Sequence, residues 1–484
     1  QVGQVYFSCF NCLSYSFFNS FTNIDSLLIF TSNHTFFLVI YAAKKGKSVI
    51  LLDGKWIGGT CLNEGCIPTK ALVKSSELYN DLINGEKHGI SAKDIKIDFE
   101  KVIDNKNQIT EKLVSGIKFL LNRYGVKVIE GYGTFLNDKQ VKVSENEEDY
   151  IIEAKNIIIA TGSKTKHLPI KGINLKNVFD SGSILNNTKL PSSLTVIGGG
   201  IIGMEFAFIY AQLGVKVNVI EFLPRILPTV EKDVALRLVR FAKQLDIDIY
   251  TSSAVEAIEK SDEGLKIVYK RKDKQEELIS EYVLEAVGRG PNIDKLGLEN
   301  TGLEYDERNG VSVDSHMRTN IENIYAIGDV TNIIQLAHVA SHQAIVAIDN
   351  INGVKKEINY DIIPSVIFTN PPIATVGLTE EACKEKGIEI EMVKTPFSAN
   401  GKALILESET GFIKLIRDKL TKKLIGATIF GKEAENLVAS YGIAISNKLD
   451  AEQIKETVFA HPTIQELVHE SVLGLDKEAI HFVD

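Results

Sequence analysis

Two cysteines five residues apart are the side chains best suited to redox chemistry in this sequence. Cys61 and Cys66 lie in the segment GGTCLNEGCIPTK. On an ideal helix they would be separated by about 7.5 Å of rise, beyond the roughly 7 Å that a disulfide can span. We therefore expect the backbone to distort, with Gly65 permitting the distortion, and we interpret the pair as a redox dithiol.

Cys66 is expected to be the activated thiol of the pair. Because Pro68 is tolerated in a first helical turn, a helix is predicted to start near Cys66 and to continue through residues 71–79. The helix dipole acidifies a thiol at this position, and Lys70, one turn later on the same face, favours the thiolate further. The alternatives are two buried structural cysteines or half of a zinc site, although no further Cys or His lies at short spacing.

A glycine cluster marks a second candidate site. The segment VIGGGIIGME contains Gly198, Gly200 and Gly203, follows a predicted strand, opens a predicted helix and leads into a strand ending at Glu221. This context is typical of a dinucleotide-binding unit, in which the backbone approaches a pyrophosphate at the helix N-terminus. Glu221 would bind the ribose hydroxyls and repel a 2′-phosphate, which favours NAD over NADP, and the nearby Arg225 weakens that preference. The alternative is a glycine-rich turn that binds nothing.

Two strand ends and one histidine add further candidates. Thr161 and Gly162 follow one predicted strand, and Asp329 follows another, where its carboxylate could hold a polyol hydroxyl. Each is a common strand-to-turn sequence. His461 stands five residues before Glu466, so the carboxylate could orient the imidazole as an acid/base dyad for a thiol. A capping or surface histidine explains the same spacing equally well.

These side chains need several strand–helix units to position them. Hydrophobic runs predict strands at residues 48–53, 126–130, 156–160, 195–197, 216–221 and 324–327, and a long helix at residues 100–124. Beyond Pro364 the pattern is mixed, with strands near residues 412–416 and 424–430 and helices near residues 432–447 and after residue 461. The predicted fold class is α/β, with two Rossmann-like nucleotide-binding domains followed by a C-terminal α+β domain.

Composition is typical of a large globular protein. At 484 residues the chain is long enough for about three domains. Its 54 basic and 63 acidic residues give a net charge of −9, which argues against nucleic-acid binding because it repels a phosphate backbone. Five cysteines are too few for a disulfide-dense secreted scaffold.

Residues 1–41 differ in composition from the rest of the chain. Asp25 is their only Asp, Glu, Lys or Arg, whereas charges arrive every few residues from Lys44 onward. A secretory signal needs a basic region and a mitochondrial presequence is Arg-rich, so neither is expected. The apolar run at residues 27–41 is interrupted at residues 31–35 and falls short of the roughly 20 residues that span a bilayer, so no membrane anchor is expected.

Together the motifs resemble those of the pyridine nucleotide-disulfide oxidoreductases, most of all the branch that oxidises dihydrolipoamide. The resemblance covers about residues 42–475 and rests on GGTCLNEGCIPTK, ATGS, GGGIIGMEFA, AVGRGPN, TNIENIYAIGDV, FSANGKA and AHPTIQE. It implies that Cys61 exchanges with the substrate dithiol and that Cys66 is the thiolate facing the flavin. It also implies that His461, from the other subunit of a homodimer, is the acid/base group, and that Glu466 orients it.

The resemblance also implies the cofactors and their binding residues. Lys70 would pair with Glu205 beside the flavin, and Asp329 would bind the ribityl chain of FAD. The NAD-binding residues would be Gly198, Gly200, Gly203 and Glu221, and the remaining cofactor-binding residues would be Thr161, Gly162, Gly288, Ala337 and Lys70.

The implied reaction is the oxidation of protein-bound dihydrolipoamide to lipoamide, with reduction of NAD+ to NADH, through a disulfide between Cys61 and Cys66. The implied partners are a second copy of the chain and the lipoyl domains of 2-oxo acid dehydrogenase complexes, in the cytoplasm or else the mitochondrial matrix. The alternatives are a mercuric or glutathione-type reductase and a flavin-deficient structural pseudoenzyme. Glutathione-type members carry basic residues where Glu221 stands, and mercuric ones add a C-terminal cysteine pair that residues 471–484 lack.

One motif of the family is missing. Its members begin with a strand and a GxGxxG turn for the FAD pyrophosphate, whereas Gly3 is the only glycine between Gln1 and Lys45. We therefore expect residues 1–41 to replace the first FAD-binding strand and glycine turn. Either the chain cannot hold FAD normally, or these residues are not the natural coding sequence, which the abrupt change in composition favours. The expected domains are FAD-binding (residues 42–163), NAD-binding (164–285), a return to the FAD-binding domain (286–350) and dimerisation (351–484).

Overall fold

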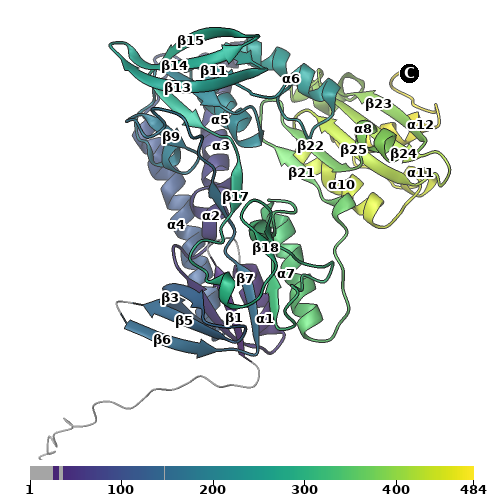
Figure 1. Ribbon diagram of the computed structural model, residues 1–484. Coiled ribbons are helices and arrows are strands. Elements are labelled where there is room, and N and C mark those ends of the chain that lie inside the picture. Colours follow the sequence, from purple (N-terminus) through teal and green to yellow (C-terminus); the bar gives the residue numbers. More distant parts are fainter. Residues whose placement is uncertain (1–25, 32–35, 146–147, 484) are drawn as a thin grey trace, which may run out of the picture.

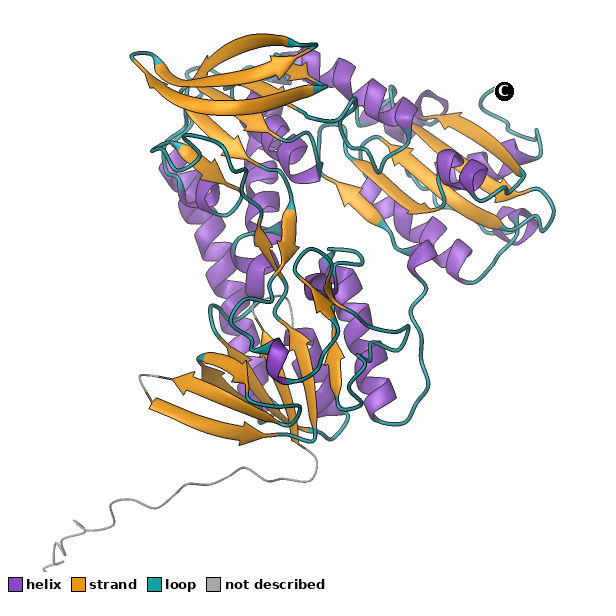
Figure 2. Ribbon diagram, viewed as in Figure 1, coloured by secondary structure: helices purple, strands orange, loops and turns teal. Residues whose placement is uncertain are grey.

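The computed structural model of the protein describes residues 26–31, 36–145 and 148–483. In this part of the chain, three five-stranded sheets occupy separate regions of the molecule (Figure 1). The first two sheets are parallel and the third is antiparallel. Helices lie against all three sheets (Figure 2). The predicted fold class, two Rossmann-like domains followed by an α+β domain, is confirmed.

The first sheet has the order β20-β7-β1-β2-β3. Its strands are β1 (Ser26–Thr31), β2 (Ser48–Asp53), β3 (Lys127–Glu130), β7 (Asn156–Ala160) and β20 (Ile324–Ala326). The strand β1 is central, since it pairs in parallel with both β2 and β7.

The presence of β1 corrects one expectation. We expected residues 1–41 to replace the first strand, but residues 26–31 form it and α1 (Phe36–Lys44) follows. The cause is the continuous apolar run Leu27–Phe30, which suits a strand buried on both faces, and these four side chains are at most 2% exposed. The glycine turn expected to be missing would fall on residues 32–35, which lie outside the described residues.

Two layers cover the first sheet. On one face lie α1, α4 (Phe99–Arg123) and α7 (Ala337–Ile351), which share a hydrophobic core with Leu27 and Ile29. The opposite face, with Leu28 and Phe30, packs on an antiparallel sheet of three strands. These strands are β4 (Tyr132–Phe135), β5 (Gln140–Glu145) and β6 (Glu148–Glu153).

The second sheet has the order β12-β11-β10-β16-β9. Its strands are β9 (Val178–Asp180), β10 (Ser193–Ile197), β11 (Lys216–Ile220), β12 (Ile247–Tyr250) and β16 (Tyr282–Glu285). The helices α5 (Ile201–Gln212) and α6 (Lys232–Gln244) share its core, and the antiparallel strands β13 (Ser253–Ser261), β14 (Gly264–Arg271) and β15 (Lys274–Ser280) pack on its other face.

Two connections join the first and second domains. The strands β8 (Ser163–Thr165) and β17 (Arg289–Pro291) pair antiparallel where the chain leaves the first domain and returns to it. The helix α3 (Cys66–Ile83) contributes Leu72 and Val73 to the core around α5. The segment that begins at Cys66 therefore contacts both nucleotide-binding domains.

The third sheet, near the C-terminus, has the order β21-β22-β25-β24-β23. Its strands are β21 (Ser365–Ile367), β22 (Ile373–Gly377), β23 (Ile390–Pro396), β24 (Phe412–Asp418) and β25 (Leu424–Phe430). The accompanying helices are α8 (Glu380–Glu385), α9 (Gly401–Ile405), α10 (Ala434–Ser446), α11 (Ala451–Lys455) and α12 (Glu466–Leu475).

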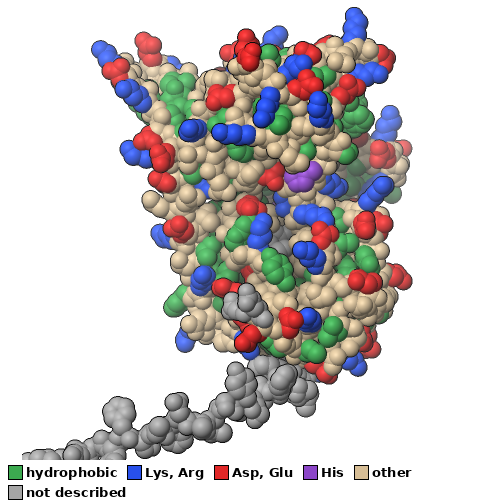
Figure 3. All heavy atoms as spheres, turned by 60° about the vertical axis from the view of Figure 1, so that its left-hand side comes forward, with side chains coloured by type: hydrophobic (Ala, Val, Ile, Leu, Met, Phe, Trp, Pro, Cys, Tyr) green, Lys and Arg blue, Asp and Glu red, His purple; other side chains and the backbone are tan. Residues whose placement is uncertain are grey.

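The surface carries charges of both signs. Basic and acidic side chains are mixed over the face shown in Figure 3.

None of the helices in the described ranges is long and apolar enough to cross a membrane.

Candidate functional site

The two cysteines meet because the helix is broken between them. The short helix α2 (Gly59–Asn63) ends before Glu64, and α3 begins at Cys66, with Gly65 between them at φ −142° and ψ −117°. A Cβ on Gly65 would lie 3.0 Å from the carbonyl oxygen of Thr60. The predicted distortion is therefore present, and it brings the two thiols into hydrogen-bonding contact.

The environment of the pair separates the pKa values of the two thiols. The hydrogen bond from Cys61 lowers the pKa of Cys66 to about 7, and the nearby Lys70 cation acts in the same direction, against the effect of burial. The same hydrogen bond, together with burial, raises the pKa of Cys61. In the dithiol form, Cys66 is therefore the more acidic thiol of the pair, and Cys61 is the one that keeps its proton to higher pH.

Lys70 and Glu205 form an ion pair between the first two domains. The ammonium of Lys70 donates to both carboxylate oxygens of Glu205 at 2.9 and 2.8 Å. The Glu205 side chain is only 5% exposed, and it also accepts a hydrogen bond from the backbone N–H of Phe368 at 2.9 Å. The pairing implied by the resemblance is present, and it fixes the cation near Cys66.

His461 and Glu466 are also adjacent. The imidazole Nδ1 lies 2.9 Å from one carboxylate oxygen of Glu466, and the other oxygen accepts a hydrogen bond from the Thr463 N–H at 2.9 Å. Although burial opposes it, the hydrogen bonds from Thr463 and His461 keep the pKa of Glu466 below its usual value. The His461 side chain is 79% exposed. No hydrogen bond or ion pair among the described residues joins it to Cys61 or Cys66 of the same chain.

The second sheet presents the glycine turn as predicted. Gly198 has φ +112°, and a Cβ there would lie 2.4 Å from the Ala286 carbonyl oxygen. A Cβ on Gly203 would lie 1.9 Å from the Gly198 oxygen, so only glycine allows this close helix–strand packing. A Cβ on Gly200 would meet nothing within 4 Å, which leaves open space at the N-terminus of α5. Glu221, directly after β11, accepts from the N–H of Gly199 at 2.5 Å.

The remaining candidates cluster at the carboxyl ends of β7 and β20. The Thr161 hydroxyl donates to the Asn292 carbonyl oxygen, and Gly162 has φ +69°. Ser163 donates to the Asp329 carboxylate at 2.6 Å, although burial raises the pKa of Asp329. Two candidates lie outside this group: Gly288, at φ +107°, directly precedes β17, and Ala337 is the first residue of α7.

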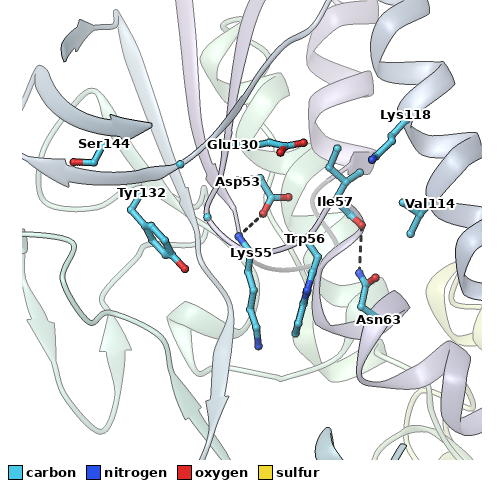
Figure 4. A pocket seen from close by; sticks show the side chains of 12 residues that line it. Asp53, Lys55, Trp56, Ile57, Asn63, Val114, Lys118, Glu130, Tyr132 and Ser144 are labelled. Atoms are coloured by element: carbon cyan, nitrogen blue, oxygen red, sulfur yellow. Dashed lines mark hydrogen bonds between the residues drawn. The ribbon is translucent and has the colours of Figure 1, made fainter. Parts of the chain in front are cut away.

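Asp53 is a further candidate that was not predicted from the sequence. This residue ends β2, and its carboxylate accepts from the Lys55 N–H at 3.0 Å (Figure 4). It borders a cavity of about 460 Å³ that Trp56, Glu130 and Tyr132 also line. Burial raises the pKa of Asp53. The available signal was the acidic residue at the end of a parallel strand, the same pattern that identified Glu221.

These residues fit an NAD, together with the ribose and ribityl groups of a second dinucleotide. The turn before α5 exposes backbone without side chains, with the Glu221 carboxylate directly after the neighbouring strand, as an NAD site requires. In the first sheet, the cavity at Asp53 and the group around Asp329 and Gly162 lie at the carboxyl ends of its strands, where open parallel sheets bind ligands. The carboxylates of Asp53 and Asp329 could each accept hydrogen bonds from the hydroxyl groups of a ribose or a ribityl chain. No cluster of metal-binding side chains occurs among the described residues.

Comparisons with known proteins agree with this site. The family model for pyridine nucleotide-disulphide oxidoreductases matches residues 37–344, and that of the family's dimerisation domain matches residues 363–472. A dihydrolipoyl dehydrogenase of Staphylococcus aureus is 36% identical over 447 residues, which cover 92% of this chain and 95% of that protein. A dihydrolipoyl dehydrogenase of Bacillus subtilis (strain 168) is 37% identical over 463 residues, covering 95% and 98%.

Solved structures show the same fold. A Cu(II) complex of the HOCl-induced flavoprotein disulfide reductase RclA from Escherichia coli superposes with a TM-score of 0.83 at 29% identity, covering 93% of this chain and 99% of that one. LpdA from Mycobacterium tuberculosis superposes with a TM-score of 0.87 at 23% identity, covering 93% and 100%. The chain belongs to the pyridine nucleotide-disulphide oxidoreductase family, and it is an oxidoreductase of the kind that uses FAD and NAD.

Proposed function

We propose that the protein oxidises dihydrolipoamide carried on lipoyl domains and reduces NAD+ to NADH. The observation that carries the proposal is the Cys61–Cys66 pair, in which a thiolate with a pKa of about 7 is hydrogen-bonded to a second thiol and flanked by Lys70. The pair can cycle between this dithiol and a disulfide. The dihydrolipoyl dehydrogenases of S. aureus and B. subtilis support the choice of substrate.

The first half-reaction is a thiol–disulfide exchange. His461, supplied by a second copy of the chain, takes the proton of one substrate thiol at Nε2, while Glu466 holds Nδ1. The substrate sulfur attacks Sγ of Cys61 in the disulfide, and Cys66 leaves as a thiolate. The second substrate thiol then attacks the mixed disulfide while its proton passes to Cys61, which closes the lipoyl ring and releases Cys61 as a thiol, and the first proton stays on His461. One substrate dithiol is oxidised and one protein disulfide is reduced.

The second half-reaction returns the protein pair to the disulfide. Asp53, Asp329 and the turn at Gly162 would hold FAD, which would supply the two-electron transfer from the dithiol to NAD+. The Lys70 ammonium stabilises the Cys66 thiolate. The thiol of Cys61 also stabilises this thiolate, by donating a hydrogen bond to it, until Cys61 loses its proton. Glu205 positions the Lys70 ammonium. Glu221 and the glycine turn before α5 hold the NAD.

The protein is proposed to act as a homodimer. The dimerisation-domain match at residues 363–472 supports this state. The exposure of the His461 imidazole, and its lack of a bond to the cysteines of its own chain in the described residues, favour a dyad that serves another copy. We place the enzyme in the cytoplasm, in line with its bacterial relatives.

The test is a pair of single-cysteine variants of the flavin-loaded protein. Cys61→Ser keeps the Cys66 thiolate and should show a long-wavelength charge-transfer band, whereas Cys66→Ser should not. Both should lose NAD+-dependent dihydrolipoamide oxidation. Cys383→Ser is the matched control, because Cys383 is buried in the C-terminal domain and its replacement should leave spectrum and turnover unchanged. Equal spectra for Cys61→Ser and Cys66→Ser would contradict the assigned roles.

A second candidate is a disulfide reductase that runs in the opposite direction. The 29% identity to the flavoprotein disulfide reductase of E. coli favours it. The two functions differ in the preferred electron flow. If NADH-driven reduction of a non-lipoyl disulfide exceeds dihydrolipoamide oxidation in kcat/KM, the second candidate replaces the first.

A further inference from the structure

Arg225 lies in the segment that directly follows Glu221, the proposed acceptor of the NAD ribose hydroxyls. It is the only basic residue in the segment FLPRILP that follows Glu221. This segment folds back onto the glycine turn, because the Leu227 N–H donates to the Gly199 carbonyl oxygen at 2.9 Å. A Cβ on Gly199 would lie 2.8 Å from Cγ2 of Ile226 and 3.2 Å from Cβ of Glu221. Arg225 therefore belongs to the segment that packs on the glycine turn, four residues after the Glu221 carboxylate that should exclude a 2′-phosphate.

The guanidinium of Arg225 is held by a different domain. It donates to both carboxylate oxygens of Glu381, at 2.9 and 3.3 Å, and to the Pro228 carbonyl oxygen at 2.8 Å. Glu381 belongs to α8 of the C-terminal domain. The Arg225 side chain is 27% exposed in this arrangement. A two-pronged carboxylate contact of this kind occupies the donors that would otherwise suit a phosphate.

The helix α8 is itself fixed to the NAD-binding domain. The backbone N–H of Glu380 donates to the Glu231 carboxylate at 2.8 Å, at the start of α6. The ammonium of Lys414, 6% exposed, lies 3.3 Å from Glu231 and 3.2 Å from Glu380. Because a buried ammonium is costly without its partners, this group keeps the start of α8 in place. The contacts of α8 with Glu231 and Lys414 therefore fix the position of Glu381 beside Arg225.

We propose that Glu381 is a specificity-determining residue of the coenzyme site. By pairing with Arg225 it withholds a guanidinium from the 2′ position of the ribose, so a 2′-phosphate meets the Glu221 carboxylate without a compensating cation. The proposal rests on the proposed use of NAD. It extends coenzyme choice from the βαβ unit to a residue of the C-terminal domain.

The test compares adenosine 2′,5′-bisphosphate with 5′-AMP in titration calorimetry on the purified full chain. Glu381→Gln should free Arg225 and tighten binding of the bisphosphate by on the order of tenfold, the effect of one charge-assisted contact. Binding of 5′-AMP should stay within about twofold. The double variant Arg225→Met with Glu381→Gln should lose the gain. NADPH oxidation in the flavin-loaded protein should change in parallel.

Glu389→Gln is the matched control. It removes one carboxylate from the same domain and frees Lys419 instead of Arg225, so the bisphosphate affinity should not change. Unchanged bisphosphate affinity in Glu381→Gln, in a variant with native thermal stability, would overturn the proposal, as would a gain that survives in the double variant. Failure of the proposed NAD use gives a different result: the unaltered protein would bind the bisphosphate more tightly than 5′-AMP.

Discussion

The clearest quantitative prediction concerns the hydrogen bond from Cys61 to Cys66. This bond is the largest cause that lowers the pKa of Cys66 from 9.0 to about 7. Cys61→Ala removes the donor, so the pKa of Cys66 should return to about 9, the ordinary value for a thiol. At pH 7.5 the thiolate fraction should then fall from about three quarters to about 3%, roughly 25-fold.

The assay is the alkylation rate of Cys66 by iodoacetamide as a function of pH. Thiolate absorbance near 240 nm gives an independent titration of the same group. The measurements need a background in which Cys9, Cys12 and Cys383 are Ser, so that the only other thiol is Cys61. The rate should rise with pH through about 7 in this background and through about 9 in the Cys61→Ala variant.

The conservative control is Cys61→Ser, whose hydroxyl can still donate to the Cys66 thiolate. It should retain most of the lowered pKa, while Cys61→Ala should not. The reasoning is refuted if Cys61→Ala titrates like the background protein, since a cause other than the hydrogen bond would then lower the pKa. A Cys66 thiol that titrates near pH 9 in the background protein, with Cys61 present, would also refute the reasoning.

Four further predictions follow from the site. His461→Gln should lower dihydrolipoamide oxidation on the order of a hundredfold, with hydride exchange between NADH and flavin largely spared in stopped-flow measurements. Glu221 should make kcat/KM larger for NAD+ than for NADP+ on the order of a hundredfold, and comparable values would contradict its role. Lys70→Met leaves the Glu205 carboxylate buried without its cation and should lower the free energy of unfolding by about 3 kcal/mol in urea titrations. Because residues 32–35 contain no glycine, the chain should hold less than one FAD per subunit, and a GxGxxG turn inserted there should raise the flavin absorbance of the purified protein.

The sequence was sufficient to predict those features that depend on residues within a single helix, strand or turn. The break between Cys61 and Cys66 followed from helix geometry, and the strands at Asn156–Ala160 and Leu424–Phe430 have the predicted bounds. The long helix predicted at residues 100–124 is α4, which begins and ends one residue earlier. Spacing and hydrophobic period determine these features within one element.

Contacts between residues far apart in the sequence could not be predicted from the spacing of residues. Lys70 and Glu205 are 135 residues apart, and only the family resemblance paired them. The antiparallel strands β13, β14 and β15 were not predicted, because their burial is mixed along each strand and gives a weaker signal than a buried run. At β1 the composition pointed away from a strand of the fold, although a central strand also requires a scarcity of charged residues.

The position of β20 has a consequence for the order in which the protein folds during synthesis. Its three residues, Ile324–Ala326, pair with β7, although the whole second sheet lies between them in the chain. On the ribosome, the inserted domain between β8 and β17 emerges complete while the first sheet still lacks its last strand. Domains emerging first fold first, so the NAD-binding domain should be native before the first domain is closed. Until then the backbone groups of β7 on that side are an open edge, which is the part of the nascent chain most exposed to wrong strand pairing.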